Sequence, residues 1–139
     1  MSFFGKKFRR IGCENMEALV KQTNPISPQL AYILNAPAPV FSYTQHSPDQ
    51  YIFRLELDSK VMSHFFRLGE ELELEKKDGS KVKVTYTLGA HNVLHKVVQT
   101  QDGKKMAHFR QEFGENEAIM YIKLDGSDVE GRVYYEAVT

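Results

Sequence analysis

Two arginines and a tyrosine in the last third of the chain have side chains that suit anion binding. Arg132 and Tyr134 are two residues apart in the segment Gly131–Val138, and Arg110 belongs to the segment Met106–Phe113. Successive side chains of a strand point to opposite faces, so Arg132 and Tyr134 would share one face. A guanidinium can bind a carboxylate through two parallel hydrogen bonds, and a phenol adds a directional donor. Inside a barrel the three groups predict a carboxylate site; on an ordinary surface they would be cations paired with glutamates.

Length and composition indicate one domain without a strong electrostatic field. The 139 residues are enough for one core, so we expect a single domain over residues 1–139. Lys plus Arg equals Asp plus Glu at 18 each, which argues against nucleic acid as a partner. No apolar run approaches the roughly 18 residues of a membrane span. The first ten residues are too charged for a secretory signal, and Cys13 is the only cysteine, so we expect a cytoplasmic protein.

Helical periodicity occurs only within residues 14–36. Met16, Leu19 and Val20 have the i, i+3, i+4 spacing of a short apolar stripe. Ser27 and Pro28 are typical of a second helix start, and prolines at 37 and 39 end it. The second apolar stripe comprises Leu30, Ile33 and Leu34. Two short helices are therefore predicted between the first and second strands.

The rest of the chain is rich in short strands joined by turn residues. Turn signals include Asp78-Gly79, Asp102-Gly103 and Asp125-Gly126, which favour tight antiparallel connections. About ten strands in an up-and-down order would leave two exposed edges unless they closed into a barrel. We predict an all-β, ten-stranded antiparallel barrel with the following strands: Phe3–Ile11, Val40–Gln45, Gln50–Asp58, Lys60–Arg67, Glu71–Lys76, Lys81–Leu88, Val93–Gln99, Met106–Phe113, Ala118–Leu124 and Arg132–Val138.

This ordered set resembles the intracellular lipid-binding proteins, the fatty-acid-binding protein family of the calycin superfamily. The resemblance spans nearly the whole chain and rests on these segments: Phe4 to Phe8 with Glu14-Asn15, Leu68-Gly69-Glu70-Glu71, Asp78-Gly79 to Leu88, Asp102-Gly103-Lys104 to Arg110, and Arg132-Val133-Tyr134. It implies a β-clam capped by the helix pair, with one lipid inside. It also implies that Arg110, Arg132 and Tyr134 hold the lipid carboxylate. The chain departs from the family at Ser80, where a third arginine is usual.

The remaining site residues are expected to enclose the lipid tail. Phe53, Leu55 and Leu57 alternate with charged residues, so we expect their face to be internal. The underside of the lid would comprise Met16, Leu19, Leu30 and Ile33. Ile119 and Tyr121 match inward positions of the family, and Gln99 is expected to be an inward polar group near the arginines. The five histidines show no metal-ligand spacing, and we expect neither a metal nor a cofactor.

Several functions are compatible with such a barrel. The favoured hypothesis is a monomeric, non-catalytic carrier of a long-chain fatty acid, with transient membrane contact through the lid. A retinoic acid carrier of the same fold is the near alternative. A protein-interaction barrel without a lipid is the alternative from a different class. A hydrolase would need a nucleophile and a paired base, and we find no such signature in the sequence.

Overall fold

The computed structural model describes residues 3–21, 39–57, 60–75, 81–89, 92–100 and 106–138. In chain order, the elements are β1 (Lys7–Glu14), α1 (Met16–Lys21), β2 (Val40–Ser47), β3 (Gln50–Leu57), β4 (Lys60–Phe66), β5 (Glu71–Glu75), β6 (Lys81–Leu88), β7 (Val93–Thr100), β8 (Met106–Phe113), β9 (Glu117–Leu124) and β10 (Glu130–Val138).

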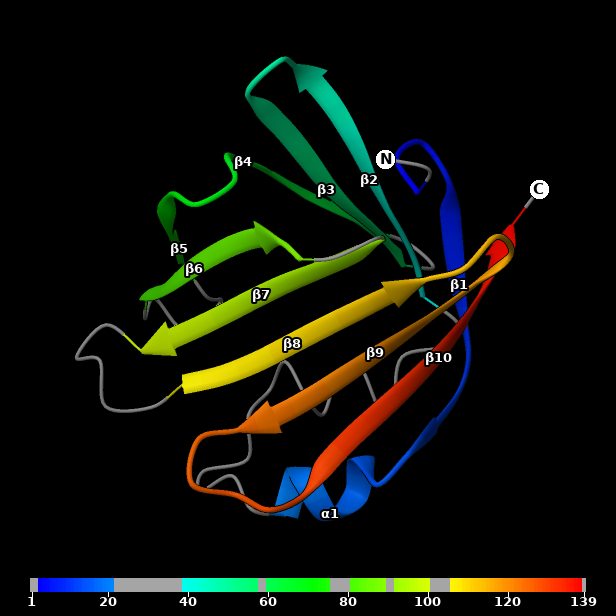
Figure 1. Ribbon diagram of the computed structural model, residues 1–139, viewed down its shortest axis with the longest axis vertical. Coiled ribbons are helices and arrows are strands. Elements are labelled where there is room, and N and C mark those ends of the chain that lie inside the picture. The colour runs from blue at the N-terminus through cyan, green and yellow to red at the C-terminus, as the bar shows by residue number, and fades with distance from the viewer. Residues whose placement is uncertain are drawn as a thin grey trace.

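The strands form one antiparallel sheet that curls into a nearly closed barrel (Figure 1). Their order is β4-β3-β2-β1-β10-β9-β8-β7-β6-β5, so strands that follow one another in the sequence pair, except β4 and β5 at the two ends of the sheet, and β1 pairs with β10. This is the predicted up-and-down β-clam, and the prediction is confirmed. After Pro39, the described residues contain strands and turns but no helix, as expected. The predicted second helix lies outside the described residues.

Left-handed backbone conformations mark several of the turns. Gly69 and Gly126 have φ values of 78° and 79°, in the region that glycine adopts without steric cost. Asn15 has φ 59° between β1 and α1, and its carbonyl accepts a hydrogen bond from the Leu19 amide at 3.1 Å. Asparagine tolerates this conformation better than most residues do. The change from strand to helix therefore occurs within a single residue.

The first strand begins later than the sequence predicted. Residues 3–5 form a turn, and Phe3 is buried with its ring stacked on Phe113 at 4.0 Å between centroids. The predicted start at Phe3 is wrong because burial of this ring competes with extension of the strand. A register shift between Arg10 and Gly12 then interrupts the β1–β10 ladder.

The core is aromatic and is closed at one end by α1. Phe66 stacks on Tyr86 at 4.0 Å, and Phe8, Phe41 and Tyr43 belong to the same buried cluster. Figure 1 shows α1 at the end of the barrel where β10 begins. Met16 and Leu19 of α1 are fully buried there against Gly131: a Cβ atom on this glycine would lie 2.7 Å from Met16 Sδ and 3.0 Å from Leu19 Cδ2. Only a residue without a side chain permits this close approach.

Candidate ligand-binding site

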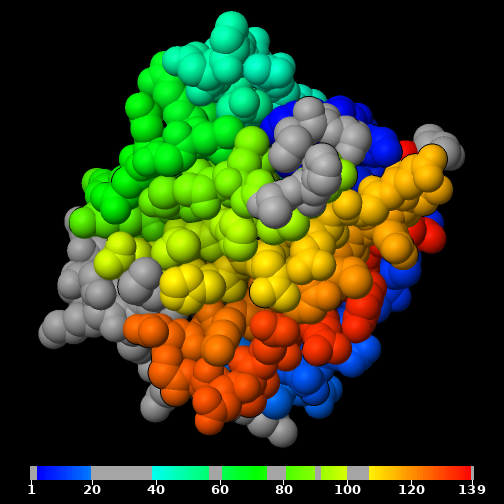
Figure 2. Space-filling view, viewed as in Figure 1, coloured from blue at the N-terminus to red at the C-terminus, as the bar shows by residue number. Residues whose placement is uncertain are grey.

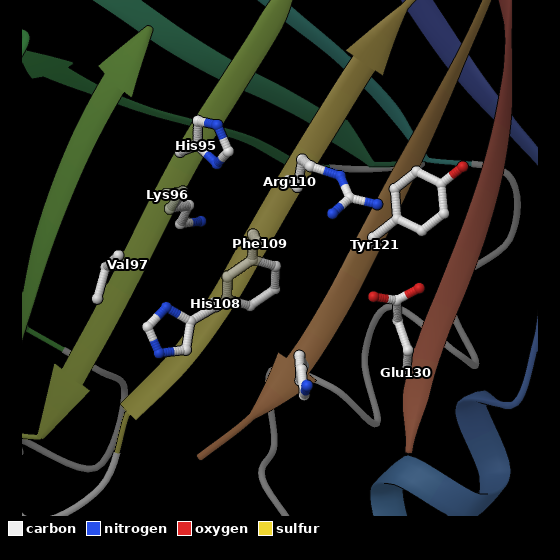
Figure 3. A pocket seen from close by; sticks show the side chains of 9 residues that line it. His95, Lys96, Val97, His108, Phe109, Arg110, Tyr121 and Glu130 are labelled. Atoms are coloured by element: carbon white, nitrogen blue, oxygen red, sulfur yellow. The ribbon is translucent and has the colours of Figure 1, made fainter. Parts of the chain in front are cut away.

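The predicted anion-binding residues come together on the outer face of the barrel. Arg110 and Arg132 both pair with Tyr121 across β8, β9 and β10. Their Cζ atoms lie 4.2 Å and 5.8 Å from the Tyr121 ring centroid, so the phenol ring lies between two guanidinium groups. Figure 3 shows Arg110 beside Tyr121, with Glu130 next to them. We call Arg110, Tyr121 and Arg132 the outer cluster.

Each arginine of the outer cluster already has a carboxylate partner. Arg110 Nε donates to Glu112 Oε2 at 2.9 Å, and Arg132 Nε lies 4.0 Å from Glu130 Oε1. The two arginine side chains are 42% and 44% exposed, so water screens these ion pairs. The cationic charge of the outer cluster is thus balanced within the protein.

Tyr134 lies beside Arg132 and also uses its hydroxyl within the protein. It donates to Glu14 Oε1 at 2.7 Å. This hydrogen bond to Glu14 raises the pKa of Tyr134, because the carboxylate favours the protonated phenol. A hydrogen bond with Tyr134 raises the pKa of Arg132, which is exposed on the same face.

The expected inward orientation of Arg110, Arg132 and Tyr134 is wrong in this structure. Their immediate neighbours face the core instead: Phe109, Gln111, Val133 and Tyr135 are all buried. A shift of one residue in a strand exchanges its two faces, because side chains alternate with a period of two. The Arg-x-Tyr motif lies on β10, but the side chains of this strand that point into the interior are those of Val133 and Tyr135. Binding of a ligand carboxylate by the three residues stays a prediction.

The same exchange of faces applies to the neighbouring strands. On β9, the buried side chains are Ala118, Met120 and Ile122, so Ile119 and Tyr121 lie on the outer face. On β7, Leu94 is buried and Val98 packs against the core, so Gln99 also faces outward. The expected inward orientation of Ile119, Tyr121 and Gln99 is therefore also wrong.

Other predicted tail-binding residues do face the interior. Phe53 and Leu55 of β3 pack against the core cluster, and Met16 and Leu19 of α1 are buried. Leu30 and Ile33 lie outside the described residues. Leu57 ends β3, but its side chain is not among those described.

Sequence reasoning missed a lysine inside the barrel. Lys96 on β7 pairs with Tyr86 on one side and with Phe109 on the other, both of which are buried. Its Nζ lies 5.1 Å from the Phe109 ring centroid, 5.7 Å from that of Phe53 and 5.8 Å from that of Tyr86. Phe53 belongs to β3, which is not a neighbour of β7 in the sheet. Lys96 Nζ therefore reaches into the interior.

His64 completes this group of side chains. Its Nε2 lies 3.0 Å from the Tyr86 hydroxyl, and its ring is 5.3 Å from Phe53. We call Phe53, His64, Tyr86, Lys96 and Phe109 the Lys96 cluster. The sequence did contain a signal for this position. Lys96 lies two residues from both Leu94 and Val98, so strand alternation places it on the same face as these apolar residues.

Burial lowers the pKa of both basic groups of the Lys96 cluster. Desolvation lowers the pKa of Lys96 to about 8, because an apolar surrounding disfavours the ammonium. Desolvation, with the charge of Lys96 as a second cause, lowers the pKa of His64 to about 4. Desolvation also raises the pKa of Tyr86. At neutral pH, the cluster thus holds an ammonium beside a neutral imidazole and a neutral phenol.

A second polar pair lies deeper in the aromatic core. The Tyr43 hydroxyl donates to Gln111 Oε1 at 2.6 Å, and burial raises the pKa of Tyr43 well above its usual range. On β10, burial also raises the pKa of Tyr135, although the nearby Arg10 guanidinium opposes this shift. Apart from Lys96 and His64, the interior formed by the described residues is therefore apolar with a few hydroxyl and amide groups.

The outer face of β7 to β10 carries a shallow groove of about 170 Å³. Its lining includes His95, His108, Arg110, Tyr121 and Glu130, which Figure 3 shows over these strands. Sites for drug-sized ligands usually measure roughly 300–1,000 Å³. Figure 2 shows the same side of the molecule, with the β2–β3 hairpin projecting at one end. The groove is too small to enclose a long acyl chain.

Two classes of site find no support in the described residues. No group of three or more His, Cys, Asp or Glu side chains is arranged to hold a metal ion there. In that same part of the chain, no helix has the length and apolarity to cross a membrane.

The ten-stranded antiparallel sheet and its apolar interior define the fold as a β-clam. No protein-family model matches the chain. A curated fatty acid-binding protein of Lepidoglyphus destructor is 37% identical over 78 residues, which span 56% of this chain and 57% of that protein. The match thus covers a little over half of the relative.

Solved structures match over almost the whole length. The fatty acid-binding protein from brain tissue of Drosophila melanogaster aligns with a TM-score of 0.78 and 27% identity, over 97% of this chain and 99% of the other. The Schistosoma mansoni fatty acid binding protein in complex with arachidonic acid has a TM-score of 0.81, with 99% and 97% coverage. Its 21% identity supports the fold alone. The resemblance to the fatty-acid-binding proteins is confirmed.

Proposed function

We propose that this protein is a non-catalytic carrier that holds one long-chain fatty acid inside the barrel. The proposal rests on a set of apolar side chains that face inward and pack against the core but are only partly buried: Phe53, Leu55, Leu72, Leu74 and Val98. An enclosed acyl tail would cover this surface. The match to the Drosophila fatty acid-binding protein supports the same function.

The acyl tail would contribute most of the binding free energy. Each buried CH₂ group contributes about 0.8 kcal/mol, so roughly fifteen methylenes give a gross term of about 12 kcal/mol. Loss of rigid-body freedom and ordering of the tail offset much of this term. A charge-assisted hydrogen bond to the head group adds about 1.5–3 kcal/mol. The tail therefore sets the affinity, and the head-group site selects an acid over an alcohol.

The proposed roles of the predicted residues follow from their positions. Phe53 and Leu55 would contact the tail from β3, and Met16 and Leu19 would close the barrel under α1. We also propose that the carrier is a cytoplasmic monomer. Its single cysteine, Cys13, is exposed and has no second cysteine to pair with, which suits a reducing compartment. Membrane contact through the lid stays a prediction.

The test is a displacement titration on delipidated protein. A fluorescent fatty-acid analogue should bind with a stoichiometry of one, and palmitate should displace it. Retinoic acid, palmityl alcohol and a short-chain acid are the comparison ligands. Tighter binding of retinoic acid than of palmitate would favour the retinoid alternative. Absence of binding by every lipid, together with no lipid in organic extracts of the native protein, would overturn the carrier function.

A further inference from the structure

Lys96 differs from the outer arginines because its neighbours are rings rather than carboxylates. Among the described side chains, no carboxylate lies within salt-bridge distance of its Nζ, and no hydrogen-bond acceptor is paired with it. Its three ring contacts, at 5.1, 5.7 and 5.8 Å, stabilise the positive charge but accept no conventional hydrogen bond. A partly desolvated ammonium in this position lacks an anion.

The cost of burying this charge favours a ligand-binding role over a purely structural one. A charge in an apolar interior is unfavourable unless it is paired and hydrogen-bonded. An apolar residue of similar length would fill the same space between Leu94 and Val98 without that cost. Burial of the Lys96 ammonium thus lowers the stability of the barrel, although the packing of β6, β7 and β8 does not require a cation there.

We propose that Lys96 Nζ binds the anionic head group of the enclosed lipid, so that the barrel selects singly charged anionic amphiphiles over the corresponding alcohols and esters. The proposal deepens the fatty-acid carrier function and rests on it. It replaces the arginine-based site expected from the sequence with an ammonium at the centre of the Lys96 cluster.

Tyr86 and His64 are placed to support the head group. The hydrogen bond between Tyr86 and His64 has two arrangements, since either the hydroxyl or the imidazole N–H can donate. If His64 Nε2–H donates, the Tyr86 hydroxyl is left with its own proton to donate to a carboxylate oxygen. Tyr86 lies directly across the strand pair from Lys96, so both groups can reach one head group.

The titratable groups around Lys96 determine how binding depends on pH. Tyr86 faces it from β6 and His64 from β4; Phe53 and Phe109 face it from β3 and β8 and do not titrate. Burial lowers the pKa of Lys96 to about 8, and a bound carboxylate would raise it again. Above pH 8, binding of the carboxylate is therefore coupled to the uptake of a proton by Lys96. Acid affinity should fall as pH rises beyond 8, by up to about tenfold per pH unit.

The decisive experiment compares palmitate with palmityl alcohol in three variants. Lys96→Met removes the charge and keeps an unbranched side chain, Lys96→Arg keeps the charge, and Arg132→Gln removes a cation of the outer cluster as the matched control. Lys96→Met should weaken palmitate binding by about tenfold or more, as expected for loss of a charge-assisted hydrogen bond. Binding of the alcohol should change by less than about threefold. Lys96→Arg should retain more acid affinity than Lys96→Met does.

Each outcome separates this proposal from the carrier function on which it rests. Unchanged palmitate affinity in Lys96→Met, with normal binding by the parent protein, overturns the Lys96 assignment and leaves the carrier intact. Failure of the parent to bind either ligand overturns the carrier function itself. The parent also provides a test that needs no folded variant. Its affinity for palmitate, but not for palmityl alcohol, should decrease between pH 8 and pH 9.5, and equal pH profiles for the two ligands would contradict the proposal.

Discussion

The two faces of the β7–β10 sheet handle positive charge in opposite ways. Outside, Arg110 and Arg132 each have a glutamate partner and share the ring of Tyr121. Inside, Lys96 has three aromatic neighbours and, among the described side chains, no carboxylate within salt-bridge distance. A cation that is already paired with a carboxylate of its own protein attracts a ligand anion only weakly. The type of residue is thus a weaker guide to an anion site than the balance of charge around it.

The largest difference between the faces should appear when aromatic rings are removed. Phe113 is buried and its ring contacts Phe3, Phe8 and Phe41, so Phe113→Ala should lower the free energy of unfolding by about 3–5 kcal/mol. The matched change on the outer face is Tyr121→Ala, which loses mainly two cation–π contacts and should cost about 1–2 kcal/mol. Urea unfolding measures both. Equal costs would contradict the assignment of the two faces.

The contact between α1 and β10 gives the next largest effect. A side chain at position 131 would lie within 3 Å of Met16 Sδ, so Gly131→Val should destabilise the protein by about 1–3 kcal/mol. Gly12 has no atom within 4 Å of an added Cβ, and Gly12→Val is the control with little expected loss. If the two variants unfold at the same urea concentration, α1 does not close the barrel as described.

Acid should weaken the inner face selectively through His64. Its pKa is lowered from 6.5 in an unperturbed histidine to about 4, so between these values the unfolded chain binds a proton more readily than the native protein does. Stability from this source is present above pH 6.5 and is lost as the pH falls to 4. Allowing for solvent screening, the loss should be about 1–2 kcal/mol. His64→Gln should reduce the loss measured by urea unfolding at pH 4.5 and 7, whereas the outer-face variant His95→Gln should retain it.

The smallest effect is expected at the outer cluster. Arg132→Gln removes an exposed, screened ion pair with Glu130, so the palmitate affinity should change by less than about twofold. A displacement titration against palmitate and palmityl alcohol checks this value. Loss of acid binding by about thirtyfold, with the alcohol unaffected, would instead support the sequence-based assignment of Arg132 to the carboxylate site.

The fold was predictable from local sequence, whereas the orientation of several strands was not. Turn residues such as Gly69 and Gly126 separate the strands at the expected places. On β3, apolar Phe53 and Leu55 alternate with charged residues, so the inner face was correctly predicted. On β10, Arg132 and Glu136 alternate with apolar Val133 and Ala137, and the inward assignment of the arginine came from the family resemblance rather than from this alternation. Packing of Val133 and Tyr135 into the core determines which face is internal.

The site was less predictable because tertiary packing assembles it. Lys96 is one of many surface-type residues in the sequence, and its neighbours Phe53 and His64 are more than thirty positions away. No local pattern indicates that β3 and β4 approach β7 across the interior. The predicted arginines do converge with an aromatic residue, but on the solvent side of the wall. The convergence of the two arginines on a tyrosine ring was expected in kind, and their position on the outer face was not.

The strand order gives the barrel wall a mechanical property. β4 and β5 are the two edge strands of the sheet, and in the described residues no strand pairing joins them. Across this seam, the Phe66 ring stacks on Tyr86, and the His64 imidazole is hydrogen-bonded to the same tyrosine. In the described residues, this seam is therefore held by these side-chain contacts and by the Gly69 amide, which donates to the Tyr86 carbonyl at 2.7 Å. A change in the width of the barrel at this seam would therefore disturb these few contacts and leave every strand–strand ladder in place.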